Sequence, residues 1–149
     1  MMRNSITLQL KIVTGEIMQP SVETTPTSRK QLWAGRVISA LPVLMLLLSG
    51  VMKLLKPVPV VEGFAHYGYP ESQIVFLGIL EIACTLVYVI PQTSYLGAIL
   101  MTPYLGGATA SNVRVGDPSY LAMVILGILG WGGLFFRDAR LRALLPFRS

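Results

Sequence analysis

Four apolar stretches, each long enough to cross a lipid bilayer as a helix, limit the fold of this chain more than any other feature. They lie at about residues 36–55, 74–91, 94–112 and 118–136. A helix needs about 20 mainly apolar residues to cross the hydrocarbon core. None of the four stretches carries the charged face that a surface helix of a small soluble protein requires. We therefore predict an all-α fold, a membrane-spanning antiparallel four-helix bundle.

The charged residues agree with this class in their number and in their distribution. Only 13% of the 149 residues are charged, whereas a soluble domain has about 25%. The net charge is +5, but the basic residues lie between the apolar stretches and at the chain ends. A nucleic-acid-binding protein would gather them with aromatic residues on one face, so we expect no nucleic-acid partner. One cysteine, Cys84, and one histidine, His66, cannot supply a CxxC pair or a multi-histidine metal centre, and no metal is predicted.

Lysine and arginine are distributed unequally between the two ends of the predicted helices. Of those near the predicted helices, seven lie on the face that carries both chain termini, whereas Lys53, Lys56 and Arg114 lie on the opposite face. Cytoplasmic segments of membrane proteins carry the excess of these residues. We therefore expect an integral protein of the bacterial inner membrane with both termini in the cytoplasm.

The sequence predicts one membrane domain between two tails. Residues 1–32 lack a spanning segment and a signal peptide, and they predict a disordered or extended tail in which Met18 is an alternative start. Residues 33–137 hold the four helices, and residues 138–149 form a basic cytoplasmic tail. The connection between the first two helices is the longest, and its aromatic residues suit the lipid headgroup region. They are Phe64, Tyr67 and Tyr69.

Four residues are candidates for a buried polar cluster: Lys53, Glu81, Asn112 and Arg114. Glu81 lies near the middle of the second helix, where a charge costs at least about 2.5–3.5 kcal/mol and needs a partner, a proton or a wet cavity. Lys53 and Arg114 belong to the same half of the membrane and can reach it with their long side chains. The favoured interpretation is a structural ion pair, because no second buried carboxylate accompanies Glu81. A buried acidic site that carries protons or holds a ligand is the alternative.

Glycines in the third and fourth helices predict close helix packing. Pairs of small residues four positions apart, such as Gly106 with Ala110 and Gly107 with Ser111, allow helix backbones to approach each other. We expect the same role for Gly97, Gly127 and Gly130.

Several phrases of the sequence resemble the DoxX-like family. They are SGVMKLLKP, HYGYPES and GAILMTPYLGGATA followed by VRVGDP. The resemblance covers the chain from about Arg29 to Phe136 and implies a small four-helix integral membrane protein. The recurrent positions that it implies are Lys53, Glu81 and Arg114. Many relatives carry histidine where this chain has Asn112, which weakens any role that needs a titrating group there.

The resemblance implies no established activity, and the sequence contains no catalytic constellation, which argues against an enzyme. We expect an accessory or structural membrane subunit whose partners are the lipid bilayer and either further copies of itself or another membrane protein. One alternative is a small-solute carrier or channel that uses the carboxylate of Glu81. Another is a membrane subunit of a quinone-linked oxidoreductase, because the family takes its name from a subunit associated with thiosulfate–quinone oxidoreductase. No cofactor is predicted, and nothing in the sequence supports a quinone site.

Overall fold

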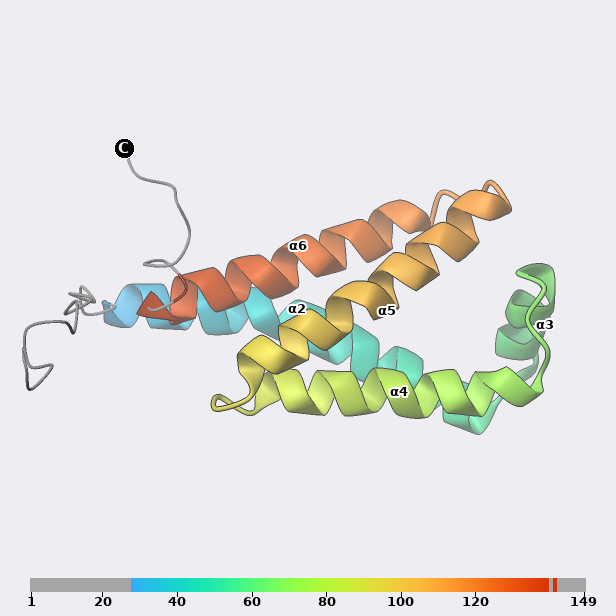
Figure 1. The fold of residues 1–149 in the computed structure, drawn as a ribbon, viewed down its shortest axis with the longest axis horizontal. Helices are drawn as coiled ribbons and strands as arrows, with labels where there is room; N and C mark the ends of the chain where they lie inside the picture. The colour runs from blue at the N-terminus through green and yellow to red at the C-terminus, as the bar shows by residue number, and fades with distance from the viewer. Residues whose placement is uncertain (1–27, 140, 142–149) are drawn as a thin grey trace, which may run out of the picture.

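The computed structural model describes residues 28–139 and 141, and this part of the chain is helical (Figure 1). Its helices are α2 (Arg29–Leu55), α3 (Val58–His66), α4 (Ser72–Val89), α5 (Ser94–Arg114) and α6 (Tyr120–Arg137). The described residues contain no strand, so the predicted all-α class is confirmed. Nearly all of the two predicted tails lies outside the described residues.

The four long helices run up and down beside one another. Helix α2 packs against α4 and α6, and α5 packs against the same two helices, so the main contacts form a ring. The start of α2, the end of α6 and the turn between α4 and α5 lie toward one end of the molecule (Figure 1). The short helix α3 lies across the opposite end.

Helix α2 begins at Arg29, about seven residues before the predicted start. Ser28 and Gln31 form a capping box, in which each side chain accepts a hydrogen bond from the backbone N–H of the other residue. Residues 29–32 therefore belong to the first helix, and their assignment to a tail is wrong. The ends of α4, α5 and α6 differ from the predicted ends by two residues or fewer.

Helix α3 forms within the long connection that was predicted between the first two spanning helices. Lys56 ends α2 in the left-handed backbone conformation, with φ of 48°. Pro57 then serves as the N-cap of α3, and Pro59 lies in its first turn. Proline is well tolerated there because the first helical N–H groups have no intrahelical partner. Two prolines that resemble helix breakers therefore mark the start of a new helix.

Three pairs of helices approach most closely at glycines. A Cβ atom at Gly97 of α5 would lie 2.2 Å from the backbone of Tyr88 on α4. Gly50 on α2 meets α4 at Gly78, and Gly133 on α6 meets α2 in the same way. The predicted packing role therefore holds for Gly97. It does not hold for Gly106 and Gly107 of α5, where a Cβ atom would meet nothing within 4 Å.

Helices α2, α4 and α6 are long and apolar enough to cross a membrane. Most of their apolar residues face outward, and such large exposed apolar surfaces are typical of proteins in contact with lipid. Helix α5 has 21 residues but is not among these candidate spans of the described chain. Length and composition thus support three of the four predicted spans, and the crossing by α5 stays a prediction.

Candidate functional site

The buried carboxylate of Glu81 forms an ion pair with Lys53. The Lys53 Nζ atom lies 2.8 Å from Glu81 Oε2, and Nζ also donates a hydrogen bond to the hydroxyl of Ser49. The side chain of Glu81 is only 3% exposed and that of Lys53 is 14% exposed. The pair joins α2 to α4, and Ser49 lies one turn before Lys53 on the same face of α2. The ammonium group of Lys53 neutralises the carboxylate of Glu81, which would otherwise be a buried charge without a partner.

The backbone of α4 allows this approach because position 78 has no side chain. A Cβ atom at Gly78 would lie 2.9 Å from the Cβ of Lys53 and 3.0 Å from the carbonyl oxygen of Gly50. Glycine at 78 thus permits the two helices to approach at the level of the lysine. Glu81 follows one turn later on the same face of α4, where Lys53 reaches it.

Tyr104 adds α5 to this site. Its partly buried hydroxyl interacts with the carboxylate of Glu81. The sequence analysis missed Tyr104 because a single tyrosine in an apolar helix usually packs as an aromatic residue. A buried carboxylate needs hydrogen-bond donors. A tyrosine at a similar depth in the neighbouring helix could therefore have been predicted as a partner of Glu81. We call Ser49, Lys53, Glu81 and Tyr104 the inner cluster.

Asn112 and Arg114 lie in a separate cluster around Tyr67. The Tyr67 hydroxyl donates toward Asn112 Oδ1 at 2.9 Å and toward Asp117 Oδ2 at 2.7 Å. The guanidinium of Arg114 donates to the backbone carbonyl of Tyr67. These four residues form the outer cluster, which ties the end of α3 to the connection between α5 and α6.

The four residues predicted as one buried cluster are therefore divided between two. Asn112 is buried, with 6% exposure, but its side chain bonds to Tyr67 and to the carbonyl of Ala108. Arg114 is exposed, because it ends α5 and its side chain turns toward the connection after α3. Its predicted burial beside Glu81 is corrected accordingly.

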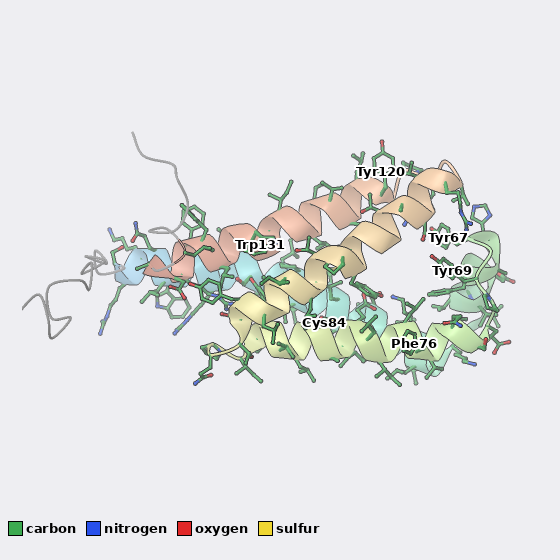
Figure 2. The ribbon with its side chains drawn as sticks, in the orientation of Figure 1. Tyr67, Tyr69, Phe76, Cys84, Tyr120 and Trp131 are labelled. Atoms are coloured by element: carbon green, nitrogen blue, oxygen red, sulfur yellow. The ribbon has the colours of Figure 1, made fainter. Side chains whose placement is uncertain are left out.

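The outer cluster holds its single carboxylate in the charged form. The backbone N–H and the side chain of Ser119, followed by the Tyr67 hydroxyl, lower the pKa of Asp117 to about 2. Partial burial and then the Asp117 carboxylate raise the pKa of Tyr67. Figure 2 shows Tyr67 and Tyr69 between α3 and the end of α5, and the Tyr69 hydroxyl lies 2.8 Å from that of Ser111.

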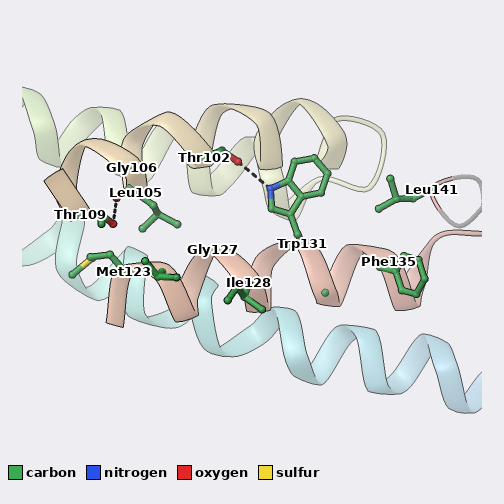
Figure 3. A pocket seen from close by; sticks show the side chains of 12 residues that line it. Thr102, Leu105, Gly106, Thr109, Met123, Gly127, Ile128, Trp131, Phe135 and Leu141 are labelled. Carbon is green, nitrogen blue, oxygen red and sulfur yellow. Dashed lines mark hydrogen bonds between the residues drawn. The ribbon is translucent and has the colours of Figure 1, made fainter. Parts of the chain in front are cut away.

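An open groove of about 670 Å³ runs between α5 and α6 (Figure 3). Trp131 of α6 donates its indole N–H to the Thr102 hydroxyl at 3.0 Å, and Thr109 donates to the carbonyl of Leu105. Both threonine hydroxyls are therefore hydrogen-bonded within the protein. The remaining lining is mostly apolar and includes Ile128 and Phe135.

Comparison with known proteins places this chain in a family. A family model of the DoxX-like family matches residues 37–132. The chain belongs to the DoxX-like family. No curated protein and no solved structure matches it.

The part of the DoxX-like protein that matches the family contains the inner cluster, the outer cluster and most of the groove. Family membership and the three apolar helices together identify an integral membrane protein of unestablished activity. Across residues 28–139 and 141, no three His, Cys, Asp or Glu side chains come together as a metal site. The two clusters contain an ion pair and hydrogen bonds that join separate helices.

Proposed function

We propose that this DoxX-like protein is a structural or accessory subunit of a membrane assembly. In this proposal its outward α5 face, defined as Thr102, Pro103, Gly106, Gly107 and Ala110, packs against another protein in the membrane. The observation that carries the proposal is that this face consists of small, exposed residues and that its two glycines meet no other part of the described chain. The occupant is either a further copy of the chain or a different membrane protein.

The crossing of α5 follows from its neighbours. Helices α4 and α6 run in the same direction. If both span the membrane, α5 has to carry the chain back to the side where α6 begins, because the connections at residues 90–93 and 115–119 are too short to cross the membrane. The chain then crosses four times, with both termini on one side. The basic residues near the termini favour the cytoplasm for that side.

The outward α5 face has the composition of a helix–helix contact. All five of its residues are exposed, and a Cβ atom at Gly106 or at Gly107 would meet nothing within 4 Å. The predicted close packing of these glycines therefore does not occur within the described chain. Small residues favour helix association in membranes because they allow backbones to approach closely. A partner helix would supply the missing contact, which supports the role of a subunit.

The inner cluster supports a structural role more than a carrier role. Glu81 already has a lysine partner and an interacting tyrosine, so its charge is neutralised without a transported ion. A carrier that used this carboxylate would first have to break the pair with Lys53. The pair instead joins α2 to α4 and supports the helix that contacts α5.

Topology is tested first, with alkaline phosphatase, which is active only outside the cytoplasm. Fusions after Gln92 and after Asp117 report the two ends of α5. We expect the first fusion to be inactive and the second to be active. Equal activities would show that α5 does not cross, and this would overturn the proposal.

Assembly is tested by size measurement after extraction of the membrane in mild detergent. The variant Gly106→Leu/Gly107→Leu fills the outward α5 face, and we expect it to lose the larger species and elute as the single chain. Ala83→Leu makes a similar small-to-large change at an exposed position of α4 and should leave the larger species intact. A wild-type protein that elutes as a single chain, or a Gly106→Leu/Gly107→Leu variant that keeps the larger species, would contradict the proposal.

A further inference from the structure

Helix α3 stands apart from the rest of the fold. None of its nine residues is buried, and it does not belong to the main helix contacts. It lies across the ends of the long helices (Figure 1). A helix that lies across the ends of membrane-spanning helices runs along the membrane surface. This is the direction of an interfacial helix.

The two sides of α3 differ in polarity. At 100° per residue, the apolar residues Val58, Val60, Val61, Phe64 and Ala65 occupy one continuous arc. Glu62 and His66 lie next to the Val58 end of this arc, about 40° and 80° beyond Val58, and are exposed. The middle of the apolar arc, at Val60, Val61 and Phe64, is half-buried and faces the protein. One flank of the arc, at Val58 and Ala65, remains exposed.

This exposed flank continues the apolar surface of α2. Leu55, the last residue of α2, is 70% exposed, and Val58 is 67% exposed. The left-handed backbone at Lys56 and the following Pro57 turn the chain between them. Exposed apolar side chains therefore lie on both sides of this turn, and the Lys56 side chain between them is 33% exposed and pairs with Glu71.

The outer cluster fixes α3 in this position. Tyr67 is the C-cap of α3, and its hydroxyl and carbonyl both bond to the end of α5 and the following connection. Tyr69 and Phe64 are also in edge contact, with ring centroids 6.0 Å apart. Tyrosine is enriched at the depth of the lipid headgroups, where one end of the side chain is apolar and the other is wet.

We propose that α3 is an interfacial helix that binds the phospholipid surface at the end of the molecule opposite the start of α2. Val58 and Ala65 contact the upper acyl chains, and Glu62 and His66 point to water. The binding partner is the lipid of the bilayer that surrounds the protein, and the contact orients the connection that carries the outer cluster.

Spin labels test this inference on the full chain in phosphatidylcholine vesicles. Cys84 is first replaced by alanine, and single cysteines are placed at Val58, Glu62, Ala65 and His66. All four positions are exposed in the structure, so the labels should not disturb the fold. Collisions with oxygen report contact with lipid, and collisions with a water-soluble nickel chelate report contact with water. We expect a severalfold higher ratio of oxygen to nickel collisions at Val58 and Ala65 than at Glu62 and His66.

Each other outcome would overturn the inference. High nickel collision rates at all four positions would place α3 in water above the membrane. Low rates with both reagents at Val58 and Ala65 would indicate a protein contact, such as a second copy of the chain. High oxygen collision rates at all four positions would place the whole helix inside the hydrocarbon core. The test does not depend on the α5 face, so it can fail while the proposed subunit role stands.

Discussion

The inner and outer clusters both join separate helices with polar side chains, but they do so in different surroundings. The inner cluster centres on Glu81, which is 3% exposed and pairs with a lysine across the contact between α2 and α4. The outer cluster centres on Tyr67, lies at the end of the helices and includes the exposed Arg114. Water can replace a lost partner in the outer cluster, whereas it cannot readily do so in the inner one.

The comparison shows that burial, more than the number of bonds, decides what a polar contact contributes. Both clusters contain several hydrogen bonds, but in the outer cluster only Asn112 is buried, whereas Tyr67, Asp117 and Arg114 are partly or fully exposed and can be reached by water if they separate. In the inner cluster, loss of one partner leaves an uncompensated charge, which costs about 3–5 kcal/mol in a protein interior.

The largest effect is expected when one member of the inner pair is removed. Lys53→Met leaves the Glu81 carboxylate buried without its cation, so we expect a loss of about 3–5 kcal/mol in the free energy of unfolding. The double variant Lys53→Met/Glu81→Leu removes both charges and should recover part of this loss. Reversible unfolding in mixed detergent micelles measures the wild type, both single variants and the double variant. Strictly additive losses from Lys53→Met and Glu81→Leu would contradict the pairing.

A smaller loss is expected when the approach of α2 and α4 is blocked and the charges are kept. Gly78→Ala places a Cβ atom 2.9 Å from that of Lys53, so the helices have to separate, at a cost of about 1–3 kcal/mol. Gly63→Ala in α3 is the matched control, because its new Cβ meets nothing within 4 Å. The control should be neutral or stabilising, since alanine favours helices over glycine. Equal effects of the two substitutions on unfolding would contradict the packing role of Gly78.

Much of the fold could be predicted because spanning helices are encoded by local composition. Long apolar stretches gave the four long helices, and the structure moves most of their ends by only a few residues. The largest error at a helix start, at α2, arose because a capping box depends on specific side-chain bonds of Ser28 and not on apolarity. The crossing by α5 stays a prediction, because glycine, threonine and serine reduce its apolarity below that of its neighbours.

The site could be predicted only in part, because a sequence does not give the rotation of one helix against another. Depth along the helices limited the partners of Glu81 to Lys53 and Arg114, and the structure contains the pair with Lys53. Depth could not show that α5 turns Tyr104 toward Glu81 and Asn112 toward Tyr67. These contacts are properties of the assembled helices.

In the outer cluster, Tyr67→Phe removes the hydroxyl that bonds to Asn112 and Asp117. We expect a loss of about 1 kcal/mol in the free energy of unfolding, the usual net value of a hydrogen bond, because water can solvate the carboxylate that remains. Tyr69→Phe is the matched control and should cost less, since the hydrogen bond of Tyr69 to Ser111 is exposed. A loss from Tyr67→Phe as large as that from Lys53→Met would show that burial does not separate the two clusters.

The smallest effect is a pH dependence that arises from Asp117. Its pKa is lowered to about 2 from an ordinary value of 3.8, so the folded protein favours the charged form. The stabilisation from this carboxylate is complete above pH 3.8 and is lost as the pH falls toward 2. Asp117→Asn removes the titrating group, so the stability difference between wild type and variant should shrink as the pH is lowered from 5 to 2. Taking the difference cancels the contributions of the other carboxylates, which both proteins share. Because Asp117 is only partly buried, the change should also weaken in high salt. A difference that stays constant over this pH range would show that Asp117 does not stabilise the outer cluster through its charge.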